Sequence, residues 1–196
     1  MNDHKGFFAM MARMKYIERW ALMRNSVSEN ICEHSLEVAM LAHGLGIIGR
    51  KRFGKDLSPE RLAMLGMYHD CTEIITGDMP TPVKYANDEL KEAYKAIEDS
   101  AAHRLLEMLP EDLRAEYESY FLPEQIPPEE YRYVKAADKL SALIKCIEEE
   151  KTGNQEFRSA KQATYESLQQ MNMPEVTVFC ETFLPEYYKT LDELEH

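Results

Sequence analysis

Apolar residues recur at intervals of three and four along most of this 196-residue chain. Such spacing places side chains on one face of an α-helix, because a helix turns once every ~3.6 residues. The longest such run comprises Leu90, Tyr94, Ile97, Ala101, Leu105 and Met108. The sequence lacks the period-2 alternation and hairpin signals that indicate strands. It therefore predicts an all-α fold, and we expect an orthogonal helical bundle.

Capping residues predict where the helices begin. Asn30 and Glu33 are spaced as a capping box, so a helix is expected from there to about residue 50. Ser58–Glu60 supplies a cap, a proline and an acid, which predicts a second helix from 58 to about 75, ending before Gly77. The other expected helices cover about 4–19, 88–108, 111–121, 128–151, 154–171 and 174–191, and the segment 78–85 is expected to be a stiff loop.

Charge and hydropathy restrict the partners. The net charge is −12, which does not suit a protein that binds nucleic-acid polymers. The longest apolar run, near Ala39–Ile48, is interrupted by polar residues and glycines and falls short of the ~18–20 residues that cross a bilayer. The polar start Met1–Gly6 does not resemble a secretion signal, and none of the four cysteines forms a C-x-x-C pair. We expect a cytoplasmic protein with no membrane partner.

A His-Asp pair is the strongest local chemical signal. His69 and Asp70 lie near the end of the predicted 58–75 helix, where two polar residues are costly to bury without partners. Glu73 follows His69 by four residues and Asp70 by three, so helical periodicity places the three side chains toward a shared site.

Two further residues suit the same site. His34 lies on the preceding predicted helix, and Asp138 lies much later, among small and apolar neighbours where a carboxylate favours a compensating charge. Two imidazoles and two carboxylates suit a borderline divalent ion such as Zn, Mn, Fe, Co or Ni better than Mg or Ca. Such an ion acidifies bound water and polarises a phosphoryl oxygen.

These motifs resemble a known family. Glu33-His34-Ser35, His69-Asp70 and Asp138 match the H…HD…D pattern of the HD-domain phosphohydrolases. Over nearly the whole chain, the sequence is similar to the 5′-deoxynucleotidase (YfbR-like) branch. The matching positions are Arg19-Trp20, Met23-Arg24, Glu33–Leu36, Met67–Asp70, Glu73, Thr76–Tyr85 and Lys135–Asp138.

The resemblance implies a single HD-type domain over residues 1–196 with the C-terminal helices packed on it. It implies hydrolysis of 2′-deoxynucleoside 5′-monophosphates to deoxynucleoside and phosphate, by metal-activated water attack on phosphorus, in a homodimer. Glu73 would handle protons and position the water, Arg19 would orient the phosphate, and one Co²⁺ or Mn²⁺ ion would be bound. The implied metal ligands are His34, His69, Asp70 and Asp138. The implied substrate-binding residues are Arg19, Trp20, His34, Asp70, Asp78, Met79, Pro80, Thr81 and Asp138.

Other interpretations fit parts of the pattern. An HD-type enzyme could act on a triphosphate, a cyclic nucleotide or an alarmone, although a triphosphate calls for more cations than the few near this site. A non-catalytic nucleotide-binding module would be expected to have lost a ligand or Glu73. Taken singly, Trp20 could be a core residue, Asp78 a turn residue and Lys84 a solvated charge.

Overall fold

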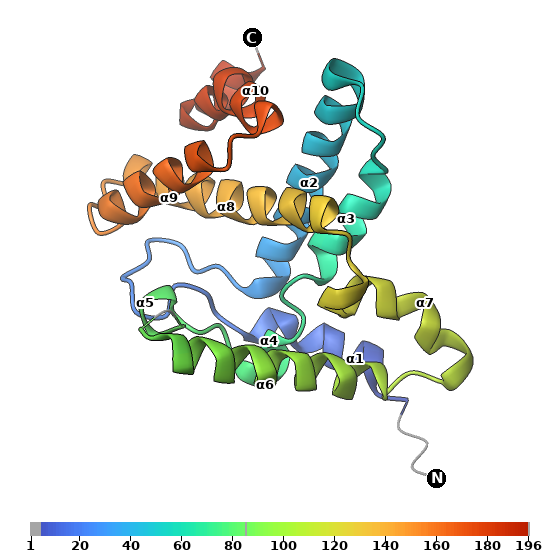
Figure 1. Cartoon of the computed structure of the whole chain (residues 1–196). Helices are drawn as coiled ribbons and strands as arrows, with labels where there is room; N and C mark the ends of the chain where they lie inside the picture. Colours follow the sequence, from blue (N-terminus) through green and yellow to red (C-terminus); the bar gives the residue numbers. More distant parts are fainter. Residues whose placement is uncertain (1–4, 85, 196) are drawn as a thin grey trace.

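The computed structural model describes residues 5–84 and 86–195 (Figure 1). Helices account for most of these two ranges and no strand occurs in them, so the all-α prediction is confirmed. Residues 1–4 of the polar N-terminal segment, and Tyr85 of the Thr76–Tyr85 motif, lie outside the described residues. The elements are α1 (Phe7–Met11), η1 (Ala12–Tyr16), α2 (Ile31–Phe53), α3 (Pro59–Tyr68), α4 (Glu73–Thr76), α5 (Thr81–Lys84), α6 (Asp88–Leu106), α7 (Glu111–Phe121), η2 (Pro123–Gln125), α8 (Pro128–Lys151), α9 (Arg158–Gln170), α10 (Pro174–Thr182), η3 (Leu184–Tyr188) and α11 (Leu191–Leu194).

Three helices, α2, α3 and α8, form the frame that carries the polar site. α2 begins where the capping box predicted: the Asn30 side chain accepts from the backbone N–H of Glu33, and the Glu33 carboxylate accepts from the backbone N–H of Asn30. α3 crosses α2 so closely that a Cβ added at Gly66 would lie 3.0 Å from Cα of Ala39. α8 packs against both helices (Figure 1).

The buried apolar residues form two clusters. One, here called the α8 cluster, joins α2, α3, α8, α9, α10 and η3; the other, the α6 cluster, joins α1, η1, α6 and α7. Ile31 at the start of α2 belongs to the α6 cluster, whereas Val38 belongs to the α8 cluster. Leu65 on α3 belongs to the α8 cluster, whereas Cys71 just beyond it belongs to the α6 cluster. Polar residues between these positions therefore lie at the boundary of the two clusters.

The predicted helix over 58–75 is wrong in one respect, because it breaks in the middle. α3 ends at Tyr68 and α4 begins at Glu73. Tight turns join them, with Cys71 N donating to Tyr68 O at 3.1 Å and Glu73 N to Asp70 O at 3.0 Å. Consecutive side chains on an intact helix point about 100° apart. The break allows the neighbouring side chains of His69 and Asp70 to turn toward the same point.

Other boundaries also differ from the prediction. The expected 4–19 helix is α1 followed by the 3-10 helix η1, and the expected loop 78–85 contains α5, because Pro80 O accepts from Val83 N and Lys84 N. The expected 174–191 helix divides into α10 and η3, since Pro185 has no N–H to continue the helical ladder. Ile97, expected on the buried stripe of α6, is 53% exposed.

α2 is long and apolar enough to cross a bilayer, with a mean hydropathy of 1.2 over its best window. However, 56% of that window is buried within the protein, and its buried residues include His34 and Ser35. These properties identify α2 as a core helix.

Candidate metal centre

His34 lies in the first turn of α2, and its side chain is fully buried. Its Nδ1 lies 2.9 Å from Oγ of Ser141 on α8, and Ser141 donates its hydroxyl hydrogen to the Glu37 carboxylate. Because that hydrogen is already used, the Ser141 oxygen accepts from Nδ1–H of His34. In the neutral ring this places the hydrogen on Nδ1 and leaves Nε2, which is buried without a hydrogen-bond partner, available as a ligand atom.

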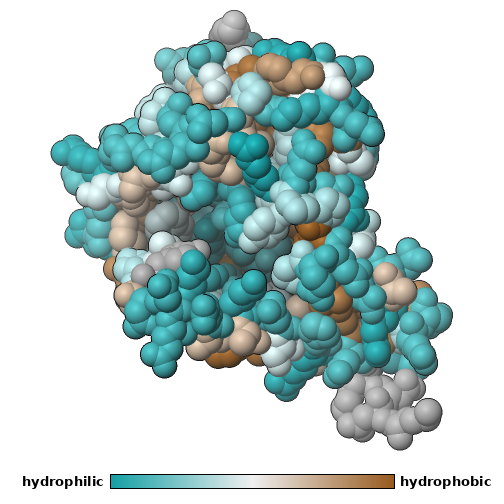
Figure 2. Space-filling view, in the orientation of Figure 1, coloured by the Kyte–Doolittle hydropathy of each residue, from teal (hydrophilic) through white to brown (hydrophobic). Residues whose placement is uncertain are grey.

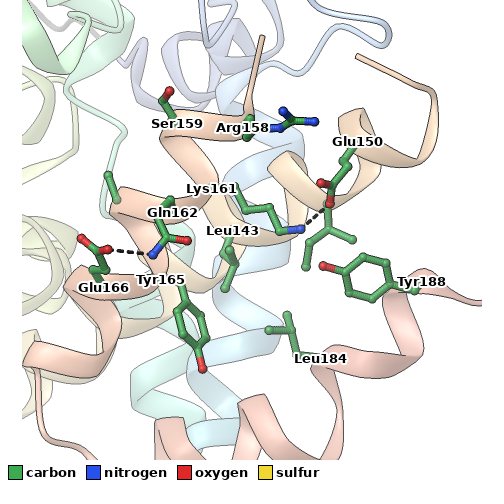
Figure 3. A pocket seen from close by; sticks show the side chains of 12 residues that line it. Leu143, Glu150, Arg158, Ser159, Lys161, Gln162, Tyr165, Glu166, Leu184 and Tyr188 are labelled. Atoms are coloured by element: carbon green, nitrogen blue, oxygen red, sulfur yellow. Dashed lines mark hydrogen bonds and ion pairs between the residues drawn. The ribbon is translucent and has the colours of Figure 1, made fainter. Parts of the chain in front are cut away.

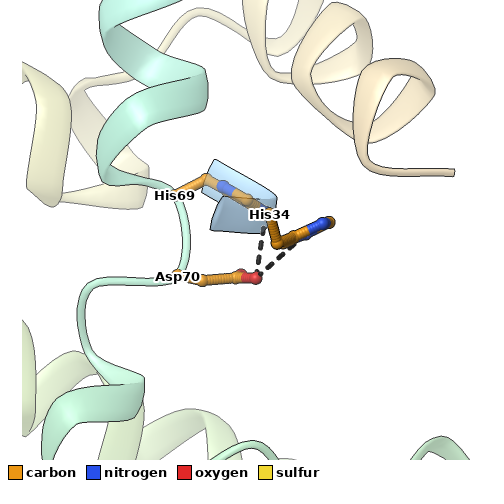
Figure 4. Close-up of side chains that lie close together, drawn as sticks. All are labelled: His34, His69 and Asp70. Atoms are coloured by element: carbon orange, nitrogen blue, oxygen red, sulfur yellow. Dashed lines mark ion pairs between the residues drawn. The ribbon is translucent and has the colours of Figure 1, made fainter. Parts of the chain in front are cut away.

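His69 is held in the same tautomer by a different partner. Its Nδ1 lies 2.8 Å from the backbone oxygen of Gly66, which can only accept, so Nδ1 carries the hydrogen. Its Nε2 is also buried without a hydrogen-bond partner. The two rings lie 5.2 Å apart between centroids, and Figure 4 shows both side chains converging near Asp70.

Two carboxylates complete the cluster. Oδ2 of Asp70 lies 3.4 Å from Nε2 of His34 and 3.0 Å from Nε2 of His69. Oδ1 of Asp138, on α8, lies 3.3 Å and 4.0 Å from the same two nitrogens. The ligand atoms of His34, His69 and Asp70 all lie within 4.8 Å of one another (Figure 4). The structure thus brings three of the predicted ligands, His34, His69 and Asp70, into one group, and Asp138 lies beside both imidazoles.

The electrostatics of this point favour a cation. Burial acts to raise the pKa of Asp70, but His69 and His34 beside it hold that pKa well below its ordinary value. Burial also acts to raise the pKa of Asp138, but His34, followed by Lys135, outweighs burial and lowers that pKa. Both carboxylates therefore favour the ionised form at this buried position. Burial and Arg19 act to lower the pKa of His34, but Asp138 and Asp70 raise it, so a cation bound here would displace a proton from that ring.

The donor set fits a divalent transition ion. Two imidazole nitrogens and two carboxylate oxygens are ligands that such ions share. Hydrogen bonds from the far ring nitrogen, like those of His34 and His69 to Ser141 and Gly66, are the usual support for metal-binding imidazoles. The fit rests on two buried Nε2 atoms that no described residue satisfies by a hydrogen bond.

Glu73 opens α4 beside the cluster and is 7% exposed. Its Oε2 is buried without a hydrogen-bond partner. Burial, followed by the charges of Asp70 and Asp78, raises the pKa of Glu73 to about 10. The carboxyl group therefore carries a proton at neutral pH, and a cation next to Asp70 would lower that pKa. A carboxyl group whose pKa is raised by burial and lowered by a nearby cation can accept or release a proton during a reaction.

Arg19 lies in the segment between η1 and α2. Its side chain is 12% exposed and pairs with Glu29 at 3.3 Å. Burial acts to lower the pKa of Arg19, but Glu29, and then Asp138 and Asp70, raise it above its ordinary value. The guanidinium thus lies within electrostatic reach of the carboxylates of the metal cluster.

Trp20 and Asp78 come from separate segments that meet here. Burial raises the pKa of Asp78, while Arg19 and a hydrogen bond from the backbone N–H of Trp20 act to lower it. The Trp20 ring is partly exposed and packs on Phe157, with centroids 5.2 Å apart. Of the three residues that follow Asp78, Met79 and Pro80 are partly exposed and Thr81 is exposed. These side chains are therefore accessible to a ligand.

Lys84 is paired within the protein. Its Nζ lies 2.9 Å from Oε1 of Glu98 and 4.7 Å from the centroid of the Tyr94 ring. The solvated-charge interpretation is therefore incomplete, because Lys84 is half-buried and ties α5 to α6.

The sequence did not predict the residues that support this site. Glu37 follows His34 by three residues and Ser141 follows Asp138 by three, so helical periodicity could have placed each on the face of a proposed ligand. Their contact joins α2 to α8, however, and only the fold reveals it. The role of Glu29 depends on a chain reversal between residues 20 and 29 that has no sequence signature we recognise.

A separate hollow lies away from this site. It has a volume of about 780 Å³ and lies between α8, α9 and η3 (Figure 3). Four of its polar side chains pair within it, Lys161 with Glu150 and Gln162 with Glu166. The face seen in Figure 2 is mainly hydrophilic, with a recess near its middle between the regions of α8 and α6.

Comparison with known proteins gives a consistent result. The family described as 5′-deoxynucleotidase YfbR-like matches residues 6–187. The 5′-deoxynucleotidase of Vibrio cholerae is 48% identical over 188 residues, covering 96% of this chain and 97% of the relative. The 5′-deoxynucleotidase YfbR of Shigella boydii is 45% identical over 188 residues, covering 96% and 94%.

Solved structures are similar in fold. An HD-domain phosphohydrolase from Listeria innocua superposes with a TM-score of 0.80 at 22% identity, covering 96% of this chain and 91% of that one. A cyanophage S-2L HD phosphohydrolase, solved with dA and one catalytic Zn²⁺ ion, has a TM-score of 0.62 at 21% identity, covering 93% and 96%. The all-helical HD-domain fold is thereby established for this chain.

Proposed function

We propose that this chain hydrolyses 2′-deoxynucleoside 5′-monophosphates to deoxynucleoside and phosphate, because it belongs to the YfbR-like 5′-deoxynucleotidase family, as its motifs predicted. In this reaction water oxygen bonds to phosphorus, the bond from phosphorus to the 5′ oxygen breaks, and that oxygen receives a proton. One observation carries the proposal at this site: the buried Nε2 atoms of His34 and His69 lack hydrogen-bond partners and face two carboxylates.

In this proposal His34, His69, Asp70 and Asp138 hold one divalent ion, Co²⁺ or Mn²⁺. When bound, the ion supplies positive charge to a phosphoryl oxygen and makes water more acidic. The Nδ1 hydrogen bonds of the two histidines support this role, because they keep both Nε2 atoms free to ligate.

The remaining steps are assigned to the protein's own side chains. Arg19 binds and orients the phosphate, since its planar donors match two phosphate oxygens. Glu73 positions water and moves a proton at its carboxyl group. Trp20 contacts the sugar or base, and the segment from Asp78 to Thr81 lines the nucleotide site together with it.

The charges around the site favour a monophosphate. A nucleoside triphosphate carries two more phosphate groups, which call for additional cations. Arg19 is close enough to the cluster to bind one phosphate, whereas Lys84 is already paired with Glu98 at 2.9 Å.

We further propose that the chain acts as a cytoplasmic homodimer, a state implied by the family resemblance of its motifs. Light scattering coupled to size-exclusion chromatography measures the mass of the assembly directly. A mass of twice the 22.8 kDa of the chain is expected, and a single-chain mass at micromolar concentration would contradict the proposal.

The proposed activity is tested with a panel of nucleotides and metal ions. Chelation should abolish phosphate release from dAMP, and Co²⁺ or Mn²⁺ should restore it better than Mg²⁺ or Ca²⁺, with Zn²⁺ included for comparison. Asp138→Asn should weaken metal binding and lower turnover, while Glu148→Gln on the same helix should do neither. Full activity in protein shown by elemental analysis to be metal-free would refute the metal-dependent mechanism.

A further inference from the structure

Trp20 has an unusual backbone conformation. Its φ is +59°, in the left-handed region that residues with a Cβ rarely adopt, and only one other described non-glycine residue, Asn172, has a positive φ. Such a conformation persists only where surrounding contacts hold it, and it occurs frequently at functional sites. The contacts around Trp20 are therefore informative.

Hydrogen bonds hold the main chain on both sides of this residue. Arg19 N donates to Glu29 O at 2.8 Å, which fixes the reversal of the chain. The backbone oxygen of Trp20 accepts from Met23 N at 2.8 Å and from Nδ2 of Asn25 at 3.3 Å. These bonds set the backbone direction but leave the side chains of Arg19 and Trp20 to be fixed separately.

A single carboxylate oxygen contacts both side chains. Oε2 of Glu29 accepts from Nε1 of Trp20 at 2.9 Å and pairs with Nη1 of Arg19 at 3.3 Å. The guanidinium carbon of Arg19 lies 5.9 Å from the centroid of the Trp20 ring. The Glu29 side chain is 14% exposed, so water competes little with these contacts. The three side chains thus form one unit around Glu29.

Arg19 has other carboxylates within electrostatic reach, namely Asp138, Asp70 and Asp78. Two of these are proposed metal ligands, and an ion pair with Arg19 would withdraw the guanidinium from the phosphate. Among the described ion pairs, the partner that holds Arg19 is Glu29. Glu29 is therefore the contact that fixes the guanidinium among these charges.

We propose that Glu29 is a positioning residue that fixes Arg19 and Trp20 together for recognition of the phosphate and the adjoining sugar. This inference rests on the proposed function. Glu29 acts through these two side chains and is not itself assigned a contact with the nucleotide.

The chain offers a direct probe and a matched control. Trp20 is the only tryptophan, so fluorescence excited at wavelengths that indole absorbs and tyrosine does not reports on this unit alone. Glu148 lines the same acidic surface hollow as Glu29, so Glu148→Gln removes the same charge from the same surroundings. No hydrogen bond of the Glu148 side chain occurs among the described contacts.

The experiment compares Glu29→Ala, Glu29→Gln and Glu148→Gln. Glu29→Ala should red-shift the Trp20 emission, increase its quenching by acrylamide and raise KM for dAMP about tenfold or more, with metal content unchanged. Glu29→Gln keeps an acceptor for the indole but loses the charge, so the emission should stay near that of the wild type while KM rises. Glu148→Gln should change neither.

A double-mutant cycle tests whether Glu29 acts through Arg19. In an Arg19→Ala background, Glu29→Ala should raise KM by a smaller factor than in the wild type, because only Trp20 remains for Glu29 to position. A full multiplicative loss, or folded Glu29 variants with wild-type KM and emission, would overturn the proposal. If the wild-type protein does not cleave deoxynucleotides, the proposed function fails, whereas the emission and quenching data still decide whether Glu29 fixes Trp20.

Discussion

The proposed metal ligands and the proposed nucleotide contacts are held in different ways. His34 and Asp138 lie on the long helices α2 and α8, and His69 and Asp70 follow directly from α3. Buried groups of the same helices, Ser141 and the Gly66 carbonyl, support the two imidazoles.

The nucleotide side consists of loops that distant polar residues hold in place. Arg19 and Trp20 depend on Glu29, and the far end of their loop depends on Glu149 of α8, which accepts from Ser26 N at 2.8 Å. The proposed ion ligands are therefore held by the packed helices α2, α3 and α8, whereas the proposed nucleotide contacts are held by a few polar interactions. Variants that separate chemistry, metal binding, selectivity and loop anchoring can test this division.

The largest effect is expected from Glu73→Ala. Loss of a positioned acid–base group lowers kcat by about 10²–10⁴-fold, and metal and nucleotide should still bind because Glu73 is not a proposed ligand. Steady-state kinetics, elemental analysis and a binding titration with dAMP measure the three quantities. A variant that loses its ion would instead assign Glu73 to metal binding.

A smaller effect is expected from Ser141→Ala, which removes the partner of His34 Nδ1. Loss of such a supporting hydrogen bond should weaken metal affinity by about 10–100-fold. Ser35→Ala is the matched control. Ser35, on α2, is buried like Ser141, but its Oγ has no hydrogen-bond partner among the described residues. Competition with a chromophoric chelator gives the affinities. Equal affinity in both variants would show that the helical frame holds His34 without this hydrogen bond.

Sugar selectivity should change less again. Asp78 lies against the Trp20 backbone, and we expect the two residues to reject a ribose 2′-hydroxyl. An unpaired buried polar group costs about 1–3 kcal/mol, so Asp78→Ala should shift the ratio of kcat/KM for dAMP and AMP toward AMP by roughly tenfold. An unchanged ratio in folded, metal-loaded protein would return Asp78 to the role of a turn residue.

The smallest effect on catalysis is expected at Glu149, where the readout is stability against pH. Burial opposes the shift, but hydrogen bonds from Lys145, Asn154 and Ser26 lower the pKa of Glu149 from 4.5 to about 2. A lowered pKa contributes stability above pH 4.5, which is lost as the pH falls toward 2. Glu149→Gln should therefore lower Tm at pH 7 and flatten the fall of Tm between pH 5 and pH 2, as calorimetry can measure. An equally steep fall in the variant would show that other carboxylates control it.

The sequence predicted the features that depend on local signals, and it missed those that depend on tertiary contacts. Helical periodicity predicted the all-α fold, and the capping box predicted the start of α2, because these signals are local. The break after Tyr68 was missed, since its turn hydrogen bonds form within a segment whose apolar pattern is still helical. The H…HD…D pattern assigned His34, His69 and Asp138 to one site although they come from separate parts of the chain. Glu29 was missed because its partners meet it only after the chain reverses.

The boundary between the two apolar clusters has a consequence for how the protein opens. His34 lies between Ile31 of the α6 cluster and Val38 of the α8 cluster, so the proposed ligands lie where the two halves of the interior meet. An ion bound there would link these halves without adding apolar contact. Amide hydrogen exchange should then slow on metal addition in helices far from any ligand, such as α6 and α10. Local opening of either half would then be coupled to opening of the whole molecule.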